Sequence, residues 1–417
     1  MENFPDEITL EILSRLPVKT VCRFRCVSKD WLKLFQNPGF IKKHMKHSIE
    51  NNQYSLMLKE GCNLYSMDLN QTLESNKALQ IDYPFDSSKG EIAMWGSCNG
   101  LVCFSINPYK DSHVMYIWNP STVQYKKIPV APIKGPPLVT ATDEIFPGVT
   151  ITDYFAYGFG YDSKIDDYKL IRMVDFPVEH RCEVRIYTLG TNSWTDASFL
   201  HYRLTHPSIA GVLSNEAIHW IATPDGTQGD LVIVSYDIRN DTFQQVVGPN
   251  SLSTELALSI CGFDGFLCLL GKTHDVQIEV WVMKEYGVTE SWTKIVTISQ
   301  PEVIPSFLYV RPIKWFKNGQ ILLEKDQTSL ALYDPKSHKA IDLEVDGVSE
   351  WLEAEIFLKS LVPVTSDTDI AAQKQTEDAT KNMDKGEKEQ KKKNTNNNNS
   401  KKKKQRTKGG VLFYGML

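Results

Sequence analysis

Few residues in this 417-residue chain have the types and spacing that chemistry requires, and the histidines are the first to test. His219 lies in the alternating stretch HWIAT, where a single histidine is typical of a structural position in a strand. His201 and His206 are five residues apart and lack the further ligands of a zinc site. His44 and His47 are three residues apart among lysines, which favours a solvent-exposed helix face. We therefore expect no metal site.

The acidic residues and glycines indicate turns rather than catalysis. Asp162, Asp166 and Asp167 cluster at a predicted hairpin turn, where Asp commonly bonds its own backbone. The stretch GFGYD at 158–162 lacks the third glycine and the following helix of a dinucleotide-binding loop. The sequence also lacks the G-x-S-x-G motif of hydrolases and a phosphate-binding loop. We expect no catalytic residue and no cofactor.

The cysteines also indicate a structural role. They include no C-x-x-C pair and lie in apolar runs, so we expect eight reduced core residues, at positions 22, 26, 62, 98, 103, 182, 261 and 268. No apolar run approaches the length of about 18 residues that a membrane-spanning helix needs. The N-terminal stretch is too acidic for a signal peptide. These features predict a protein of the cytoplasm and the nucleus.

The charge is unevenly distributed along the chain. Residues 373–417 hold 13 Lys and Arg against 5 Asp and Glu, so the rest of the chain carries a formal charge of −13. An acidic body argues against a nucleic-acid-binding surface, which needs clustered positive charge. Residues 365–417 are too polar to bury a core, which predicts a disordered Lys/Asn-rich tail. Its two lysine clusters, 391–393 and 401–404, are either a nuclear signal or a solvated segment.

Short helices are predicted near the N-terminus. The first runs from about Pro5 to Leu16, the second from about Val18 to Val27, and the third follows Ser28, a suitable N-cap. The first helix carries two apolar stripes, formed by Ile8, Ile12 and Leu16 and by Leu10 and Leu13. A unit of about 45 residues has only a marginal core of its own. The extra stripe therefore packs either on another protein or on the rest of this chain.

Four segments of this region resemble a known family. They are Phe4-Pro5, ILSRLPVKT, RFRCVSKDW and PGFIKKH, and together they resemble the F-box in its plant form, with Phe4 where Leu is usual. The resemblance implies binding to a Skp-type adaptor, which bridges to the cullin and RING subunits of an SCF ubiquitin ligase. By position, the implied adaptor contacts are Phe4, Pro5, Ile8, Ile12, Leu13, Leu16, Pro17, Val27 and Trp31.

Five weak repeats follow between Glu91 and Val345, each divisible into four short β-rich runs. The turns after the third run lie near residues 119, 190, 237, 285 and 334, so the last four repeats keep a period of about 48 residues. Tight turns with positive φ are predicted at Asn99-Gly100, Asn215-Glu216, Asp264-Gly265 and Asn318-Gly319. Residues 130–153 form a Pro-containing insertion, which we expect to be a long surface loop.

Four strands per repeat at this period are typical of a β-propeller. Residues 54–83 supply three more strands and residues 355–364 supply one, and we expect these four to form a sixth blade that joins the two ends of the domain. A β-sandwich or two stacked sheets is the alternative. The predicted fold class is α+β, with a small N-terminal helical F-box at 1–45, a linker at 46–53, an all-β propeller-like domain of six blades at 54–364, and the tail at 365–417.

The repeat region adds a second resemblance. WNPSTVQYKKIP, GFGYDSKIDDYKL and VWVMKEYGVTESWTK are similar to the F-box-associated, kelch-like domain of plant F-box proteins, which the S-locus F-box group shares. The chain looks most like the constitutive-expresser-of-pathogenesis-related-genes type, which implies restraint of plant defence through turnover of an immune receptor. We therefore expect a non-enzymatic receptor that presents a protein target for ubiquitination and proteasomal degradation. The alternatives are a propeller enzyme, such as an oxidase or a glycosidase, and an F-box protein that acts without ubiquitin ligation.

Overall fold

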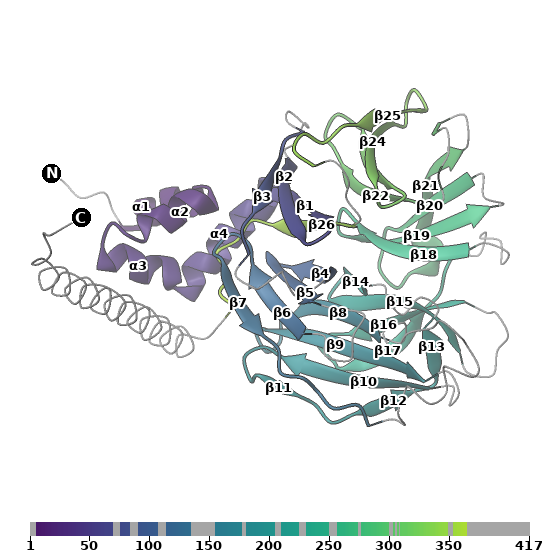
Figure 1. The fold of residues 1–417 in the computed structure, drawn as a ribbon, viewed down its shortest axis with the longest axis horizontal. Coiled ribbons are helices and arrows are strands. Elements are labelled where there is room, and N and C mark those ends of the chain that lie inside the picture. Colours follow the sequence, from purple (N-terminus) through teal and green to yellow (C-terminus); the bar gives the residue numbers. More distant parts are fainter. Residues whose placement is uncertain are drawn as a thin grey trace, which may run out of the picture. The chain divides into compact units, whose positions relative to one another are not determined.

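The computed structural model shows four helices followed by a ring of six β-sheets, all within residues 1–364 (Figure 1). The structure describes residues 6–69, 76–83, 91–106, 114–134, 155–176, 181–204, 210–224, 231–249, 257–273, 277–299, 303–304, 307, 309–348 and 353–364. The tail predicted at 365–417 lies outside the described residues.

Four helices make up residues 6–50, which we call the helical unit. They are α1 (Asp6–Ser14), α2 (Val18–Phe24), α3 (Lys29–Gln36) and α4 (Pro38–Glu50). The Ser28 side chain accepts a hydrogen bond from the Trp31 N–H at 3.1 Å, which confirms the predicted N-cap of the third helix. Asn37 follows α3, and its side chain caps α4. The second helix ends at Phe24 rather than at Val27, because the chain tightens into a turn before the extended Ser28.

Each sheet is an antiparallel blade of four main strands. Blade 1 contains β4 (Ile92–Cys98), β5 (Leu101–Ile106), β6 (Val114–Asn119) and β7 (Gln124–Lys127). Blade 2 contains β8 (Phe155–Asp162), β9 (Asp167–Phe176), β10 (Arg181–Thr188), β11 (Ser193–Trp194) and β12 (Ser198–Leu200). Blade 3 contains β13 (Tyr202–Leu204), β14 (Val212–Ser214), β15 (Ala217–Pro224), β16 (Val232–Asp237) and β17 (Thr242–Val246). Blade 4 contains β18 (Ala257–Phe263), β19 (Phe266–Thr273), β20 (Gln277–Met283) and β21 (Trp292–Ser299). Blade 5 contains β22 (Val310–Trp315), β23 (Ile321–Lys325), β24 (Ser329–Asp334) and β25 (Lys339–Leu343).

The sixth blade joins the two ends of the domain. Its strands are β26 (Glu353–Leu358), β1 (Tyr54–Glu60), β2 (Asn63–Leu69) and β3 (Ala78–Ile81), in the order β26-β1-β2-β3. β26 pairs antiparallel with β1, so Tyr54 lies opposite Leu358 and Lys59 opposite Glu353. This pairing closes the ring and confirms the predicted six-bladed propeller over a sandwich or stacked sheets. The last strand ends at Leu358, however, and residues 359–364 continue outside the sheet.

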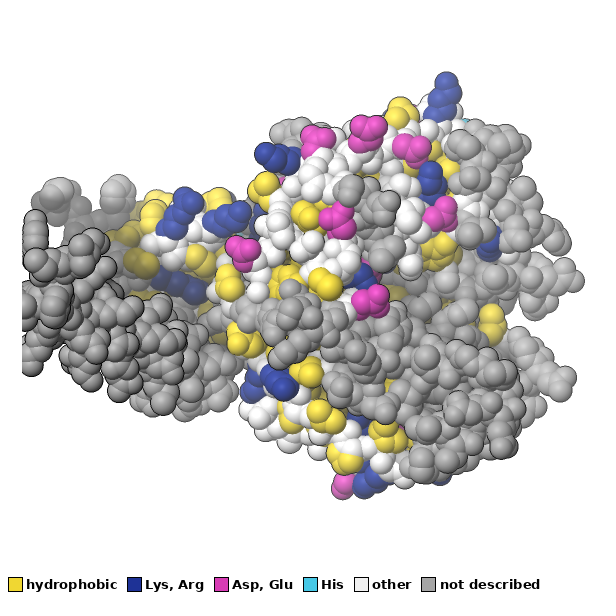
Figure 2. All heavy atoms as spheres, viewed as in Figure 1, with side chains coloured by type: hydrophobic (Ala, Val, Ile, Leu, Met, Phe, Trp, Pro, Cys, Tyr) yellow, Lys and Arg dark blue, Asp and Glu magenta, His cyan; other side chains and the backbone are white. Residues whose placement is uncertain are grey.

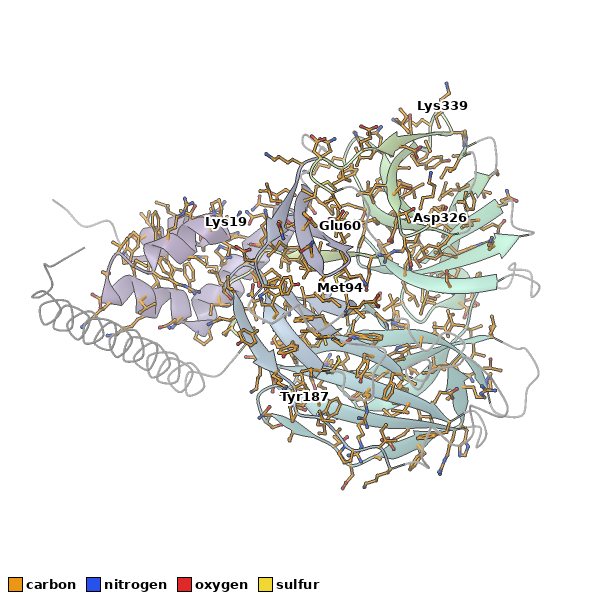
Figure 3. All side chains as sticks on the ribbon, in the orientation of Figure 1. Lys19, Glu60, Met94, Tyr187, Asp326 and Lys339 are labelled. Carbon is orange, nitrogen blue, oxygen red and sulfur yellow. The ribbon has the colours of Figure 1, made fainter. Side chains whose placement is uncertain are left out.

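The first strand of each blade lies toward the middle of the ring and the fourth lies at the rim. Inner strands of neighbouring blades contact one another, as β4 does with β8 and with β26. On the side of the propeller seen in Figure 2, acidic and basic side chains are interspersed among the described residues. Figure 3 shows Met94 of β4 near the middle and Lys339 of β25 at the rim.

Charged side chains meet where β22, β23, β26 and β1 approach the middle of the ring. Arg311 pairs with the buried Glu324. Lys59 Nζ lies 3.0 Å from Glu353 Oε2. Burial raises the pKa of Glu355 to about 7, with repulsion from the neighbouring carboxylates adding to it and the charge of Arg311 opposing it. The middle of the ring is therefore a cluster of opposite charges whose balance depends on pH.

The predicted tight turns are present. Positive φ angles occur at all four predicted hairpin tips, including 52° at Asn99, 89° at Gly100, 48° at Asp264, 86° at Gly265 and 89° at Gly319. These turns fix which residues of each strand lie opposite one another, and so fix which side chains enter the core.

The eight cysteines are free, and five of them are buried as expected, at positions 98, 103, 182, 261 and 268. Burial raises the pKa of Cys98 to about 12, so its thiol stays protonated at neutral pH. The expected core position is wrong for Cys26, which is exposed. Cys26 lies in the turn after α2, beyond the helical residues that pack inward.

Candidate functional site

Helix α1 has one covered and one uncovered apolar stripe. Leu13 is 5% exposed and belongs to the core cluster, with Leu10 packed against it. Ile8 and Ile12, one turn apart on the second stripe, are 47% and 53% exposed. Val27, in the turn after α2, is 64% exposed. Ile8 and Ile12 therefore do not pack on the described part of this chain, whereas Leu16 of the same predicted stripe does, and the two isoleucines are the best candidate for a partner-binding surface.

The other residues predicted to contact an adaptor differ in burial. Leu16 and Trp31 are partly buried and pack against a core cluster that the helices share with the propeller. Pro17 is exposed at the start of α2, where it holds the N-cap position. Phe4 and Pro5 lie outside the described residues. The adaptor contacts implied for all of these residues stay predictions.

A buried histidine fixes the chain after α1. His44 of α4 is 1% exposed, and its Nε2 lies 2.9 Å from the Leu16 carbonyl oxygen, to which the ring donates when Nε2 is protonated. Burial lowers the pKa of His44, so the ring is neutral at pH 7. The predicted solvent-exposed face is therefore wrong for His44. The reason is that α4 packs back on α1, a contact between residues 28 positions apart that no local pattern reveals.

Charge on the helical unit is mostly positive. Glu11 of α1 pairs with Arg15 and, at 2.5 Å, with Lys43 of α4, and the hydrogen bonds from Lys43 and Arg15 lower the pKa of Glu11 to about 2. Residues 18–36, from the start of α2 to the end of α3, by contrast contain a single acidic residue, Asp30, and five basic residues. The basic residues are Lys19, Arg23, Arg25, Lys29 and Lys33. The helical unit therefore offers apolar and positively charged groups, which suit a partner with apolar and acidic groups.

The helical unit contacts the turns of blades 1 and 2. Lys42 Nζ lies 2.7 Å from Asp166 Oδ2 in the β8–β9 turn, and Cys22 Sγ lies 3.9 Å from the Ser121 carbonyl oxygen in the β6–β7 turn. Because strands alternate in direction, the turns after the first and third strands of a blade lie on one face of the ring. We call this the near face, because the helical unit contacts it. The connections after the second and fourth strands lie on the opposite face, the far face.

Residues 359–364, which we call the strap, lie at this junction. Ser360, Leu361 and Val364 are each at most 1% exposed. The apolar side chains of the strap share one core cluster with residues of all four helices and of blades 1 and 2. The Lys359 N–H donates to the Gln53 carbonyl at 3.0 Å. The strap therefore connects the closing strand of the ring to the helical unit.

The aspartates of the β8–β9 turn are structural, as predicted. Asp162 accepts from the backbone of its own turn and pairs with the buried Lys169 at 2.7 Å. Asp167 likewise accepts from backbone N–H groups. Asp166 adds a role that the sequence did not indicate, since it adopts a φ of 56° and reaches Lys42 of the helical unit.

His219 is also structural, as its strand pattern indicated. Its Nδ1 lies 3.0 Å from the Val212 carbonyl oxygen, and its Nε2 lies 2.8 Å from the Tyr286 hydroxyl. Burial lowers the pKa of His219 to about 4. The neutral ring thus bonds within blade 3 through Nδ1 and links blade 3 to blade 4 through Nε2.

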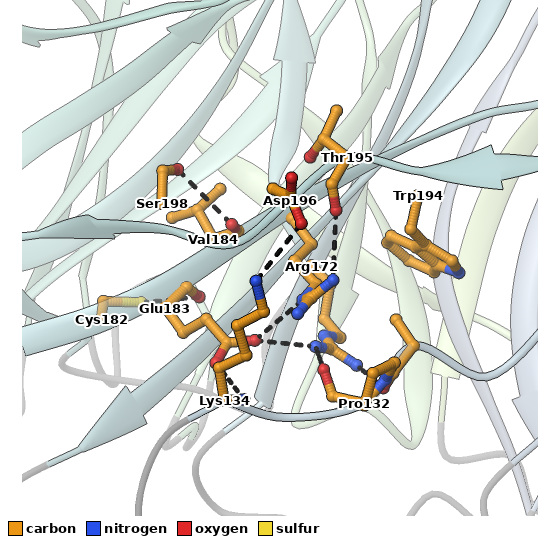
Figure 4. A network of polar contacts seen from close by, with 12 residues as sticks. Pro132, Lys134, Arg172, Cys182, Glu183, Val184, Trp194, Thr195, Asp196 and Ser198 are labelled. Atoms are coloured by element: carbon orange, nitrogen blue, oxygen red, sulfur yellow. Dashed lines mark hydrogen bonds and ion pairs between the residues drawn. The ribbon is translucent and has the colours of Figure 1, made fainter.

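A buried charge network holds the described start of the predicted insertion (Figure 4). Arg172 donates to Glu183 at 3.0 Å and to the backbone carbonyls of the first insertion residues. Glu183 is fully buried and also accepts from Arg185 at 3.2 Å and from the Lys134 N–H at 2.7 Å. The insertion therefore begins from a fixed position on blade 2, although residues 135–153 lie outside the described residues.

Candidate catalytic features are few in the part of the chain that the structure describes. Within it, no group of three or more His, Cys, Asp or Glu is arranged to hold a metal ion. A cleft of about 260 Å³ between blades 4 and 5 is lined by Lys294, Ile295, Val296, Thr297, Tyr333, Pro335 and His338. It holds no carboxylate and so lacks the paired acids of a glycosidase. None of the described helices has the length and apolar character needed to cross a membrane.

Two family matches correspond to the two regions of the fold. Residues 1–43 match the F-box domain, and residues 54–357 match the F-box associated beta propeller domain. The chain belongs to the F-box proteins. Its helical unit therefore carries the F-box, and its propeller is the F-box-associated domain, as both resemblances predicted.

Similar F-box proteins align over nearly the whole chain. The F-box protein CPR1 of Arabidopsis thaliana is 31% identical over 386 residues, covering 87% of this chain and 89% of the relative. An F-box/kelch-repeat protein of the same plant is 26% identical over 371 residues, covering 86% of this chain and 95% of the relative. The similarity thus extends over both the F-box and the propeller.

Solved structures give only weak likenesses. An oligogalacturonate lyase in complex with manganese aligns over 69% of this F-box protein and 72% of its own chain, with 10% identity and a TM-score of 0.38. The SapL1 lectin in complex with alpha methyl fucoside aligns over 68% and 91%, with 10% identity and a TM-score of 0.34. Likeness at this level carries no functional argument. An F-box joined to a propeller supports an SCF-type substrate-receptor role, in which the F-box binds a Skp-type adaptor.

Proposed function

We propose that this F-box protein is the substrate-recognition subunit of an SCF-type ubiquitin ligase and holds a protein target for ubiquitination and proteasomal degradation. The observation that carries the proposal is the uncovered pair Ile8 and Ile12 on α1. A Skp-type adaptor covers this stripe and bridges to the cullin and RING subunits. Leu13 supports the stripe from the core below it. The remaining proposed contacts are Phe4, Pro5, Leu16, Pro17, Val27 and Trp31.

The receptor contributes to catalysis by proximity. A target held beside the charged conjugating enzyme meets it at high effective concentration, so the chain needs no catalytic residue of its own. This mechanism requires a fixed geometry between the adaptor-binding helices and the propeller. The Lys42–Asp166 pair and the shared apolar cluster at the junction support such a geometry.

The charge of the helical unit predicts the chemistry of the adaptor. The surplus of basic residues over 18–36 favours an adaptor with an acidic surface next to an apolar one. At a salt concentration of 0.1 M, the attraction between exposed charges is largely screened beyond a separation of about 10 Å. Adaptor association should therefore slow as the salt concentration rises, whereas the apolar contact of Ile8 and Ile12 should persist.

The far face of the propeller is the proposed target-binding face. The near face carries the helical unit and the strap, whereas the insertion leaves β7 on the far face and is fixed there through Lys134. Recognition residues commonly lie on loops that a rigid scaffold positions. The acidic body favours a target with a basic or mixed surface patch.

We also propose a biological setting. From the likeness to the constitutive-expresser-of-pathogenesis-related-genes type, we infer that the target is an immune receptor, whose turnover restrains plant defence. The protein acts in the cytoplasm and the nucleus, with lysine clusters 391–393 and 401–404 as the nuclear signal. Deleting residues 388–408 should lower the nuclear fraction of a fluorescent fusion without weakening adaptor binding. An unchanged distribution would reduce the lysines to a solvated segment.

Affinity capture tests the receptor function. The whole chain and a chain lacking residues 1–45 are expressed in plant cells with the proteasome active or blocked, and the captured proteins are compared. A target should be enriched when the proteasome is blocked, and it should bind both chains, whereas the adaptor should bind only the whole chain. Adaptor capture without any such protein would favour an F-box role without ubiquitin ligation. If neither the whole chain nor the shortened chain captures the adaptor, the proposal is contradicted.

A further inference from the structure

The helical unit is held on the propeller by the last described residues of the chain. We propose that Asn119 and the strap form a clamp that fixes the orientation of the helical unit relative to the propeller. The clamp deepens the receptor function proposed above and rests on it, because a ligase that works by proximity needs a fixed distance between adaptor and target.

Asn119 ends β6 and is completely buried. Its side-chain amide donates to the Val362 carbonyl at 2.7 Å and to the Ser360 carbonyl at 3.2 Å. Its Oδ1 accepts from the Ser121 N–H at 2.8 Å and closes the β6–β7 turn. The Asn119 side chain thus joins the β6–β7 turn to Ser360 of the strap, 241 residues later in the chain. The same turn contacts Cys22 of the helical unit.

Equivalent turns of other blades use aspartate. Asp237 ends β16 in blade 3, and Asp334 ends β24 in blade 5. Each accepts from a backbone N–H of its own turn at 2.9 Å, as Asn119 does. A carboxylate accepts hydrogen bonds but cannot donate them. Aspartate is therefore sufficient to close this turn, and the amide of Asn119 is required only for the two carbonyls of the strap.

Gly100 provides a second contact with the strap. It lies at the β4–β5 tip with a φ of 89°, and a Cβ there would clash with the Ser360 side chain and lie 2.5 Å from the Leu358 carbonyl oxygen. Gly265, at the matching tip of blade 4, has a φ of 86°, and no atom lies within 4 Å of the position that a Cβ would occupy. The backbone conformation is the same at both tips, and only the blade 1 tip meets the strap.

The strap is also held at its other end. Lys359 pairs with Asp68 at 2.6 Å and donates its N–H to the carbonyl of Gln53, which lies between the helical unit and β1. Between these anchors, Leu361 and Val362 are buried in the cluster that includes the helices. Loss of the Asn119 contacts should therefore loosen the helical unit while the β26–β1 pairing keeps the ring closed.

Distance measurements between the two regions test the clamp. Spin labels are placed on the full chain at Lys33→Cys of α3 and Ile341→Cys of the blade 5 rim, with the exposed Cys26 replaced by Ser. Asn119→Asp should broaden the distance distribution, because the turn closes but the strap loses both donors. Asp334→Asn makes the reverse exchange in a turn without a strap and should leave the distribution as in the parent chain. An Asn119→Asp distribution equal to that of the parent would overturn the clamp.

The glycine pair gives an independent test, which stands even if Asn119→Asp does not fold. Gly100→Ala and Gly265→Ala impose the same backbone strain, but only the first introduces a clash with the strap. Gly100→Ala should broaden the distribution and Gly265→Ala should not. Equal effects of the two substitutions would assign the change to strain in the turn and contradict the clamp.

Titration of purified Skp-type adaptor into the same proteins separates the clamp from the receptor function. The clamp variants should bind the adaptor within about twofold of the parent chain, since neither Ile8 nor Ile12 takes part in the contacts of Asn119 and Gly100 with the strap, and sites without shared partners act nearly independently. Failure of the parent chain to bind would overturn the receptor function and leave the distance result standing. Loss of binding in Asn119→Asp alone would contradict a clamp that controls orientation only.

Discussion

The helical unit and the propeller cover their apolar residues in different ways. The propeller closes on itself, because β26 pairs with β1 and completes the ring around the inner strands. The four helices bury Leu13 to 5% exposure but leave Ile8 and Ile12 at 47% and 53%. The ring therefore needs no partner to complete its sheets, whereas the helical unit retains a stripe that a partner can cover. This difference distinguishes a scaffold from a docking element.

Removing the closing strand should have the largest effect on this comparison. A chain that ends at Ser349 lacks β26 and the strap, and so loses several buried side chains, among them Phe357, Leu358 and Leu361. Each large buried apolar side chain contributes about 2–5 kcal/mol, so the propeller should no longer melt cooperatively. A chain lacking 366–417 is the control and should melt like the whole protein. Similar thermal melts for both truncations would show that closure is unimportant.

Breaking the buried network of blade 2 should have the next largest effect. Glu183→Gln leaves Arg172 and Arg185 buried without their shared carboxylate, which should lower the free energy of unfolding by about 3–5 kcal/mol. Glu216→Gln removes an exposed partner of Arg239, 3.3 Å away, and should cost less than about 1 kcal/mol. Urea unfolding at pH 7 measures both changes. A cost for Glu183→Gln as small as that of the control would show that the network does not stabilise the scaffold.

The middle of the ring should show a pH-dependent effect. The pKa of Glu355 is raised to about 7 from 4.5, so its contribution to stability is present below pH 4.5 and is lost as the pH rises through 7. Glu355→Gln removes this titration. The variant should therefore gain stability relative to the parent between pH 5 and pH 8, by up to about 3 kcal/mol. Thermal melts over this range measure the difference, and a difference independent of pH would contradict a partly buried Glu355 carboxyl with a raised pKa.

Replacing the far part of the insertion should affect binding but hardly affect stability. A Gly/Ser segment in place of 135–147 preserves Lys134 and its bond to Glu183, so the melting temperature should stay within about 2 °C of the parent. Capture of the target should weaken, because the proposed recognition loop is lost. Replacement of 133–147 also removes the Lys134 side chain and its ion pair with Asp196, 3.3 Å away, and so tests whether that pair helps to anchor the loop. Full target capture after the first replacement would place recognition elsewhere.

The local sequence was enough to predict the blades but not the junction between the two regions. The tips at Asn99-Gly100 and Asp264-Gly265 and the period of about 48 residues depend on neighbouring residues, and such patterns are visible in a single sequence. The sixth blade could be predicted because the strand count left one blade incomplete. The strap could not, since Asn119 resembles any turn residue until its partners 241 and 243 positions later are known.

The candidate site was predictable to a similar extent. The two stripes of α1 follow from helical periodicity. The structure shows Leu13 covered and Ile8 and Ile12 exposed, but Leu16, predicted on the same stripe as the two isoleucines, follows the end of α1 and packs on the core. Periodicity does not show which stripe is covered, because that depends on how α4 packs on α1. The burial of His44 against the Leu16 carbonyl is such a tertiary contact, and the surrounding lysines gave the opposite indication.

Adaptor titration tests most directly whether the uncovered stripe is a docking surface. Calorimetry with purified Skp-type adaptor compares the parent chain with Ile12→Asp, and with Ile341→Asp as a control at an apolar residue that is 71% exposed on blade 5. Both positions are exposed, so both variants should fold, whereas Leu16→Ala would mix folding with binding because Leu16 packs on the core. Burial of an isoleucine contributes about 1.5–3 kcal/mol, so Ile12→Asp should weaken binding at least tenfold and Ile341→Asp should leave it unchanged. Equal affinity of all three proteins would contradict the assignment of the α1 stripe as the adaptor-binding surface.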